Sequence, residues 1–221
     1  MRRSFSLLAA SVVFAMAFTI SCDSNFKDSR DGKTYKKVKI GKQTWMAENL
    51  DYEAEGSKCY GEDAEVVIGY DENGDPITKT LSPAEVQANC DKYSRLYDWE
   101  TALKACPSGW HLPNDEEWQK LVDIAVGGEI AGTKLKATSG WKDNDGASGN
   151  GTDEYGFSAL PGGIGSSDGS FNNVGYDGVW WSATENDSNY AYDWDMGFNR
   201  SNVRRGYGYK SYLFSVRCVQ D

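Results

Sequence analysis

The sequence is poor in histidine, proline and positive charge, and each shortage excludes a class of function. Among its 221 residues only His111 is a histidine, which excludes metal sites built from several histidines and weakens most acid–base chemistry. Lys and Arg number 23 against 33 Asp and Glu, so the net charge is −10. Such a chain lacks the basic surface that neutralises phosphates, and we expect no nucleic-acid partner. With only 5 prolines, the chain is not expected to contain stiff, proline-rich linkers.

Aromatic residues and glycine are abundant instead. The 8 Trp, 13 Tyr and 8 Phe supply enough apolar surface for a folded core, which argues against an intrinsically disordered chain. The 24 glycines indicate many tight turns. The chain length is that of one domain, or of one domain preceded by a leader.

Residues 1–21 have the organisation of a bacterial signal peptide. Arg2 and Arg3 form a positive start, and residues 5–20 are uncharged and mostly apolar. This stretch is shorter than the ~20 residues of a comfortable bilayer span, which favours a signal peptide over a transmembrane helix. Residues 19–22, Thr-Ile-Ser-Cys, resemble a lipobox, in which Cys22 is lipidated and becomes the first residue of the mature chain. Residues 15–17, Ala-Met-Ala, are the alternative cleavage site.

The N-terminal leader predicts the cellular location of the protein. With Cys22 lipidated, residues 22–32 form a short polar tether and residues 33–221 form a single domain. We expect a lipid-anchored protein of the cell envelope, at the outer membrane or cell surface, that contacts the membrane only through its anchor.

The cysteine count agrees with export. Five cysteines is an odd number, and lipidation of one of them leaves four. In an oxidising compartment these four are expected to form disulfides, and three pairings are possible. No two of them lie at the CxxC spacing of a zinc site, so we expect no metal there.

Local patterns predict hairpins in the first part of the chain. Residues 34–49 read as two strands around a Gly-Lys turn. Two β-rich runs, 66–70 and 77–81, flank an Asn-Gly pair and predict a second hairpin. Alternating Asp and Asn between these runs imitates a calcium loop, but the turn accounts for every residue and the later Glu of an EF-hand is missing. Residues 143–146 are interpreted in the same way, as a solvated loop.

Three helices are expected next. The first covers residues 84–92, and the second covers 96–106, where apolar residues recur at spacings of three and four until Pro107. The third begins after Asn114, with Glu117 placed to complete a capping box. His111, in the connector before it, has no second His or Cys beside it, and we interpret it as a hydrogen-bonded structural residue.

The late part of the chain predicts antiparallel strands, at 179–184, 190–198 and 212–218. Tyr190, Tyr192 and Trp194 share one face of the second of these. Tyr192 and Trp194 alternate there with Asp193 and Asp195. These four are the candidate ligand-binding residues, because aromatic rings stack on sugar rings and carboxylates bind sugar hydroxyls. The alternative is that the aromatic residues belong to the core. In the last run Cys218 is expected to point inward.

Six stretches in the chain resemble the Fibrobacter succinogenes major paralogous domain, a large bacterial family of exported domains. The resemblance covers about residues 28–221. The stretches are 31–35 (DGKTY), 45–50 (WMAENL), 105–113 (ACPSGWHLP), 155–163 (YGFSALPGG), 180–185 (WWSATE) and 215–219 (SVRCV).

Residues 109–118 in addition resemble the helix entry of formylglycine-generating enzymes, which belong to the C-type-lectin-like superfamily. This resemblance implies an α+β domain with small twisted antiparallel sheets, two main helices and long irregular loops. C-type lectins bridge a helix cysteine to the last strand, which implies the pair Cys106–Cys218. Cys59–Cys90 would then close the base of a hairpin insertion at about residues 60–90.

The sequence departs from both active classes of that superfamily. Formylglycine-generating enzymes use two closely spaced late cysteines, and Cys218 stands alone. The calcium-binding triplets of sugar-binding lectins do not occur. We therefore expect a non-enzymatic module, with no cofactor, that binds an extracellular glycan or surface protein. The alternatives are a structural envelope lipoprotein and, less favoured, a formylglycine-generating-like enzyme.

Overall fold

Small sheets and four helices make up the part of the chain that the structure describes, residues 25–127 and 129–221 of this computed structural model. The α+β class predicted from the sequence is confirmed. The predicted signal peptide and Cys22 lie outside the described residues. Within the described ranges, no helix is both long enough and apolar enough to span a bilayer.

The largest sheet has six strands in the order β14-β13-β12-β15-β8-β5. Its three long strands form an antiparallel meander, and β15 joins β12 in parallel. The strands are β5 (Lys58–Cys59), β8 (Arg95–Tyr97), β12 (Asp177–Glu185), β13 (Tyr190–Gly197), β14 (Arg204–Tyr209) and β15 (Phe214–Ser215).

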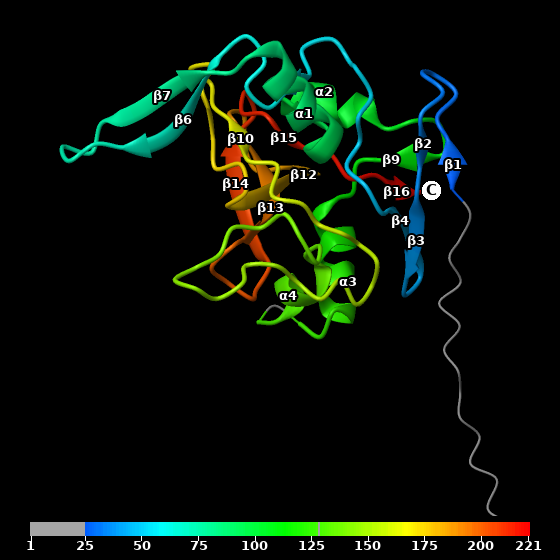
Figure 1. Cartoon of the computed structure of the whole chain (residues 1–221). Helices are drawn as coiled ribbons and strands as arrows, with labels where there is room; N and C mark the ends of the chain where they lie inside the picture. The colour runs from blue at the N-terminus through cyan, green and yellow to red at the C-terminus, as the bar shows by residue number, and fades with distance from the viewer. Residues whose placement is uncertain (1–24, 128) are drawn as a thin grey trace, which may run out of the picture.

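A second sheet, in the order β3-β4-β16-β9, places the end of the chain between two early segments. The predicted hairpin in residues 34–49 forms its first pair, with Val38 opposite Trp45. A two-stranded ribbon, β1 with β2, lies beside it (Figure 1). The strands are β1 (Phe26–Lys27), β2 (Thr34–Tyr35), β3 (Lys37–Ile40), β4 (Gln43–Met46), β9 (Trp110–His111) and β16 (Val219–Gln220).

The other predicted hairpin is also present and projects from the body as an arm (Figure 1). At its tip the Asp71 carboxylate accepts hydrogen bonds from the backbone amides of Asn73 and Asp75, at 2.8 and 2.9 Å. Asp71 thus closes the turn, as the turn interpretation requires. The strands of this sheet are β6 (Glu65–Tyr70), β7 (Pro76–Thr80), β10 (Ile164–Gly165) and β11 (Phe171–Asn172).

The helices begin where the sequence supplies caps. They are α1 (Pro83–Tyr93), α2 (Trp99–Ala105), α3 (Asp115–Ile124) and α4 (Ala131–Leu135). The predicted capping box of α3 is confirmed, since the Asn114 side chain accepts from the Glu117 amide at 3.0 Å and Glu117 accepts from the Asn114 amide at 2.9 Å. Ser82 and Glu85 form a second capping box on α1.

Two predictions about this part of the fold were wrong. The sequence predicts one helix over 96–106, but Leu96 lies in β8 and is buried against Ser215 and Lys58 of its neighbouring strands, and α2 starts only after Asp98, whose side chain caps it. Of the predicted strand 212–218 only Phe214–Ser215 is a strand, β15, and β16 begins at Val219, because the chain leaves one sheet between them and enters another.

Core side chains pack on both faces of the large sheet. On one face Trp180 and Trp194 pack against Trp118 of α3. On the other face Trp181 packs against Phe214 near α2. Both disulfides implied by the resemblance are present, Cys59–Cys90 between β5 and α1, and Cys106–Cys218 between the end of α2 and the end of the chain.

Candidate functional site

The four predicted ligand-binding residues all lie on β13, but three of them are buried. The side chain of Trp194 is only 3 % exposed; it stacks on Trp118 and donates a hydrogen bond to Asp115 Oδ1 at 3.0 Å. Trp194 therefore belongs to the core, which is the alternative that the sequence left open, because α3 covers that end of the sheet. Asp193 and Asp195 are also buried, and Tyr192 is half-buried.

Asp195 has a structural role. Its carboxylate forms ion pairs with Arg200 and, at 3.3 Å, with Arg204. Arg200 also reaches Asp177, 3.7 Å away. This network ties the loop after β13 to both neighbouring strands, and it engages the Asp195 oxygens that were expected to bind sugar.

Asp193 is a buried carboxyl group of a different kind. It faces Gly206, whose missing side chain leaves room for the carboxyl group. Burial raises the pKa of Asp193 to about 7; the positive charge of Arg204 counteracts the increase and the negative charge of Asp115 adds to it. Asp193 therefore changes charge near neutral pH without lying on an open surface.

This raised pKa makes stability depend on pH. The unfolded chain releases the proton near pH 3.8 and the folded chain near 7, so the stability contributed by Asp193 is complete below pH 3.8 and is lost as the pH rises to about 7. We expect Asp193→Asn to stabilise the protein at pH 8 by about 2 kcal/mol and to have little effect at pH 4. Thermal unfolding at both pH values measures this, with Asp143→Asn in an exposed loop as the control. An equal effect at the two pH values would contradict the assignment.

The exposed aromatic surface lies beside the predicted site. Tyr190 and Tyr192 of β13 stand opposite Tyr209 and Tyr207 of the edge strand β14. We call these four residues the tyrosine face. Tyr207 is 63 % exposed and Tyr209 is 45 % exposed. They share the side of the sheet that holds Trp194, but they lie beyond the part that α3 covers.

The phenol groups of the tyrosine face form a connected, uncharged surface. The Tyr190 and Tyr209 rings lie 4.4 Å apart between centroids, and Tyr207 stands edge-on to Tyr190 at 5.6 Å. Hydrogen bonding with Tyr209 raises the pKa of Tyr190 to about 12, so this phenol keeps its proton at neutral pH. The Arg205 guanidinium lies 3.5 Å from the centroid of the Tyr192 ring, and the charge of Arg205 is paired with Asp115 at 2.5 Å.

The sequence contained a signal for this surface that the pattern analysis missed. In residues 204–209, RRGYGY, the two tyrosines alternate with glycines. Alternation of that kind places both rings on one face of a strand. Their partners on β13 were identified, but the pairing of the two strands is visible only in the structure.

His111 is hydrogen-bonded, as expected, by partners that the sequence did not indicate. Its Nδ1 lies 2.6 Å from Asp221 Oδ1, and its Nε2 lies 2.9 Å from Glu117 Oε1. Partial burial acts to lower the pKa of His111, but hydrogen bonds with Asp221 and Glu117 outweigh it, so that the pKa is raised. An imidazole held on both nitrogens by carboxylates favours the charged form and is a poor general base.

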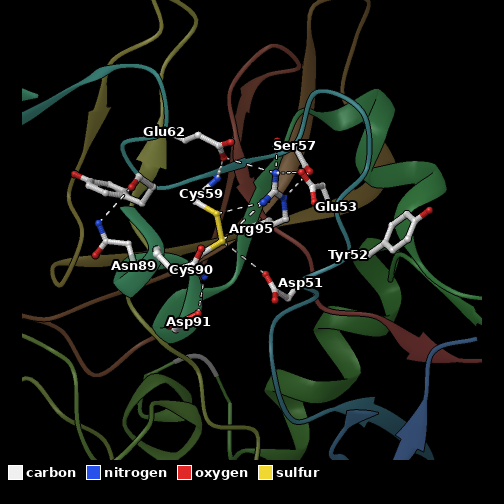
Figure 2. The surroundings of a disulfide bond; sticks show 12 residues. Asp51, Tyr52, Glu53, Ser57, Cys59, Glu62, Asn89, Cys90, Asp91 and Arg95 are labelled. Atoms are coloured by element: carbon white, nitrogen blue, oxygen red, sulfur yellow. Dashed lines mark hydrogen bonds and ion pairs between the residues drawn. A yellow bond between two sulfur atoms is a disulfide. The ribbon is translucent and has the colours of Figure 1, made fainter. Parts of the chain in front are cut away.

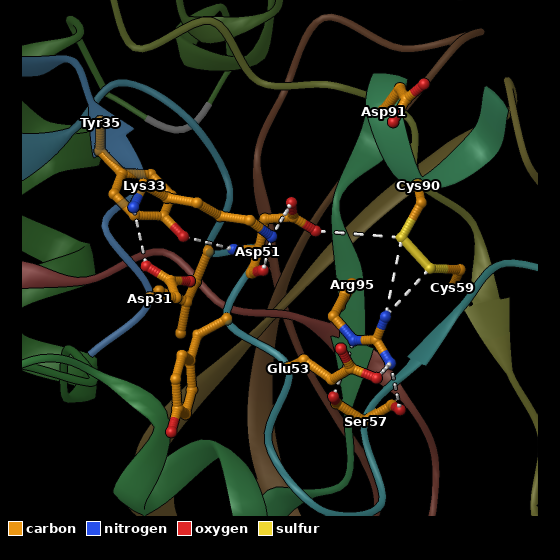
Figure 3. Close-up of polar contacts among 12 residues, drawn as sticks. Asp31, Lys33, Tyr35, Asp51, Glu53, Ser57, Cys59, Cys90, Asp91 and Arg95 are labelled. Atoms are coloured by element: carbon orange, nitrogen blue, oxygen red, sulfur yellow. Dashed lines mark hydrogen bonds and ion pairs between the residues drawn. A yellow bond between two sulfur atoms is a disulfide. The ribbon is translucent and has the colours of Figure 1, made fainter. Parts of the chain in front are cut away.

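Two open clefts lie on another side of the molecule and meet at the ion pair of Lys33 and Asp51, where Nζ lies 2.6 Å from Oδ2 (Figure 3). The larger has a volume of about 990 Å³ and the smaller about 550 Å³. Several charged groups that line the larger cleft are paired with each other, as Lys36 is with Glu48. Over residues 25–127 and 129–221, no group of three His, Cys, Asp or Glu side chains is placed to share a metal ion.

The chain is thus an α+β domain tied by two disulfides, with an aromatic surface at the edge of its largest sheet. The model of the Fibrobacter succinogenes major domain matches residues 38–220, and the chain belongs to that family. No curated protein and no solved structure matches it.

Proposed function

We propose that this protein is an exported, lipid-anchored module without enzymatic activity that binds an extracellular glycan through the tyrosine face. The observation that carries the proposal is the exposure of Tyr207 and Tyr209 on a sheet edge, next to Tyr190. Exposed aromatic side chains in a contiguous group are typical of binding surfaces.

The chemistry of the tyrosine face favours a neutral sugar chain. Tyrosine rings offer flat apolar surface for the C–H faces of pyranoses, and their hydroxyls donate and accept hydrogen bonds at low cost in conformational entropy. The charge of Arg205 is compensated by Asp115, so the surface has no excess charge to attract an ionic ligand. The protein as a whole carries a net charge of −10, which disfavours acidic glycans and nucleic acids.

The absence of turnover is proposed from the chemistry of His111. Both of its nitrogens are engaged by carboxylates, Asp221 and Glu117, and its raised pKa favours the imidazolium form. General-base catalysis requires a free nitrogen at working pH. A further part of the proposal is a C-type-lectin-like topology, supported by the α+β class and by the bridge from the end of α2 to the end of the chain.

A glycan array tests the binding proposal. We expect the mature domain to bind neutral polysaccharides, and Tyr207→Ala and Tyr209→Ala each to weaken binding about tenfold or more, which corresponds to about 1.4 kcal/mol. Chelation of calcium should leave the affinity unchanged, because the face consists of phenols. Tyr70→Ala is the matched control, since Tyr70 is equally exposed, at 67 %, but lies on the β6–β7 arm. Binding that survives both tyrosine substitutions, or that Tyr70→Ala weakens equally, would refute this site.

Export and anchoring at the outer membrane or cell surface are proposed from the leader, and the two disulfides are consistent with an oxidising compartment. We expect mass spectrometry of the membrane fraction to find a diacylglyceryl group on an N-terminal Cys22. A Cys22→Ser variant should lose this group and leave the membrane fraction. A soluble mature chain that starts at residue 18 in the wild type would exclude the anchor.

A further inference from the structure

Figure 2 shows the disulfide between Cys59 and Cys90 and the side chains around it. Both cysteines line the 550 Å³ cleft. Cys59 ends β5, and Cys90 lies in the last turn of α1. The cleft brings solvent, and any small solute it contains, next to the bridge. Cys59 and Cys90 are 5 % and 7 % exposed, so the cleft reaches only the edge of the bridge. In the other disulfide Cys218 is 0 % exposed and Cys106 is partly exposed, and neither of them lines this cleft.

A buried guanidinium lies against the sulfurs on one side. Arg95 Nη1 is 3.3 Å from Cys59 Sγ and 3.9 Å from Cys90 Sγ. Ser57 holds the guanidinium in place, because its hydroxyl accepts from Nε at 2.9 Å and its carbonyl accepts from Nη2 at 3.1 Å. The positive charge is therefore fixed closer to the sulfur of Cys59 than to that of Cys90.

Three carboxylates lie around the bridge, two of them beside Arg95 and one beside Cys90. Glu53 and Glu62 lie 3.5 and 3.6 Å from Nη2 of Arg95. Glu62 Oε2 also accepts a hydrogen bond from the Cys59 amide at 2.7 Å and offsets part of the positive charge there, but Nη1 of Arg95 remains the charged group against Cys59 Sγ. Asp51 Oδ1 lies 3.9 Å from Cys90 Sγ and disfavours a negative charge on that sulfur (Figure 3). Lys33 neutralises Asp51 in part, which keeps the approach open to an anionic thiolate.

From this arrangement we propose that Cys59–Cys90 is a thiol-exchange site, at which an external thiol becomes attached to Cys90. The attacking thiolate forms a bond with Cys90 Sγ, the bond between Cys90 and Cys59 breaks, and its electron pair remains on Cys59 as a thiolate beside Arg95. A monothiol leaves a mixed disulfide on Cys90. A dithiol completes a second exchange, in which it is oxidised to its own disulfide and both cysteines are reduced.

The direction of attack follows from the leaving group. Thiol exchange is faster when the departing sulfur has a lower pKa, and an adjacent guanidinium lowers the pKa of a thiol. Cys59 is therefore the better leaving group, and Cys90 is the sulfur that is attacked. Exchange opens the 31-residue segment that carries the β6–β7 arm, because this bridge joins its two ends. The site is separate from the tyrosine face and does not depend on the proposed function.

Glutathione trapping of the intact mature protein tests the proposal. The folded protein is incubated with reduced glutathione, quenched with acid, alkylated with N-ethylmaleimide and mapped by peptide mass spectrometry. We expect glutathione on Cys90 and the maleimide on Cys59 about tenfold more often than the reverse, with Cys106–Cys218 still closed. Equal adducts on the two cysteines, an excess on Cys59, or opening of Cys106–Cys218 first would overturn the proposal.

Variants separate the effect of the charge from simple accessibility. Arg95→Gln removes the guanidinium, and we expect the preference for Cys90 to fall to about twofold or less and the exchange to slow about tenfold. Since Arg95 is buried, Ser57→Ala serves as a milder variant, which removes the hydroxyl bound to Nε but keeps the carbonyl bound to Nη2, and it should give an intermediate preference. Glu53→Gln is the control, because Glu53 is exposed and touches only Nη2. A preference that is unchanged in both Arg95→Gln and Ser57→Ala would show that Arg95 does not direct the exchange.

Discussion

Replacing Arg217 with Met is expected to lower the free energy of unfolding by about 3–5 kcal/mol. Arg217 is 0 % exposed, and its guanidinium is held by uncharged groups. Nη2 donates to Asn49 Oδ1 at 2.7 Å, and Nη1 donates to the carbonyls of Met46, at 3.2 Å, and Phe157. Burial lowers the pKa of Arg217 to about 9, and the nearest carboxylates, Glu48 and Asp153, offset this only in part.

The loss of stability comes from the buried polar groups that no longer have the guanidinium as a hydrogen-bond donor. Met fills a similar volume, but the carbonyls of Met46 and Phe157 lose their donor in a dry environment. Asn49 keeps one partner, because Trp180 Nε1 donates to the same oxygen at 2.9 Å. Lysine is expected to be a poor substitute as well, since an ammonium group lacks the planar fork that reaches Asn49 and the two carbonyls together.

Urea denaturation measures this effect, with Lys39→Met on the exposed side of β3 as the control, expected to change stability by less than about 0.5 kcal/mol. A double-mutant cycle with Asn49→Ala should give a coupling of about 1–3 kcal/mol. If Arg217→Met is as stable as the wild type, or if the coupling with Asn49 is absent, this account of the core is incorrect.

Removing the Cys106–Cys218 disulfide is expected to be about as damaging. The bridge closes a loop of 112 residues, and in the chain-entropy model a loop of this size corresponds to up to about 4.7 kcal/mol, reduced by strain and residual structure. The Cys106→Ala/Cys218→Ala double variant also leaves a small gap in the core, because Cys218 is buried. We expect a loss of about 3–5 kcal/mol in denaturant unfolding.

The other disulfide is a matched control for this experiment within the same chain. It closes 31 residues, so the same model gives about 1 kcal/mol less for Cys59→Ala/Cys90→Ala. Its loop contains the exposed β6–β7 arm, whose β7 residues are all exposed and contribute little to the core. A larger loss for the shorter loop would show that loop entropy does not dominate here.

Much of the secondary structure followed from residues close in sequence. The capping box of α3 needs only Asn114 and Glu117, and both hairpins depend on a turn between two adjacent strands. The helix predicted at 96–106 failed because the spacing of Leu96 fits a helix, whereas its real partners are Lys58 and Ser215 on distant strands. Short elements are held by such tertiary contacts more than by local propensity.

The candidate site could be predicted only in part. Alternation along β13 correctly placed Tyr190, Tyr192 and Trp194 on one face, but it carried no information about which end of that face α3 would cover. Trp194 is therefore buried while Tyr192 is half-buried, and the exposed rings come from Tyr207 and Tyr209 on the neighbouring strand. Likewise, nothing near His111 in the sequence indicated Asp221, which is 110 positions away.

The sequence by itself determined the family, the α+β class, the two hairpins and the capped start of α3, because these rest on motifs and on contacts between near neighbours. Only the tertiary structure shows which sheets the last residues of the chain join. Residues 214–220 leave the large sheet as β15 and enter the second sheet as β16, and Arg217 meets Asn49 from 168 positions away. The physical reason is that a buried guanidinium and a buried cysteine must find their partners across the whole fold, and one-dimensional patterns do not encode which distant segments become neighbours.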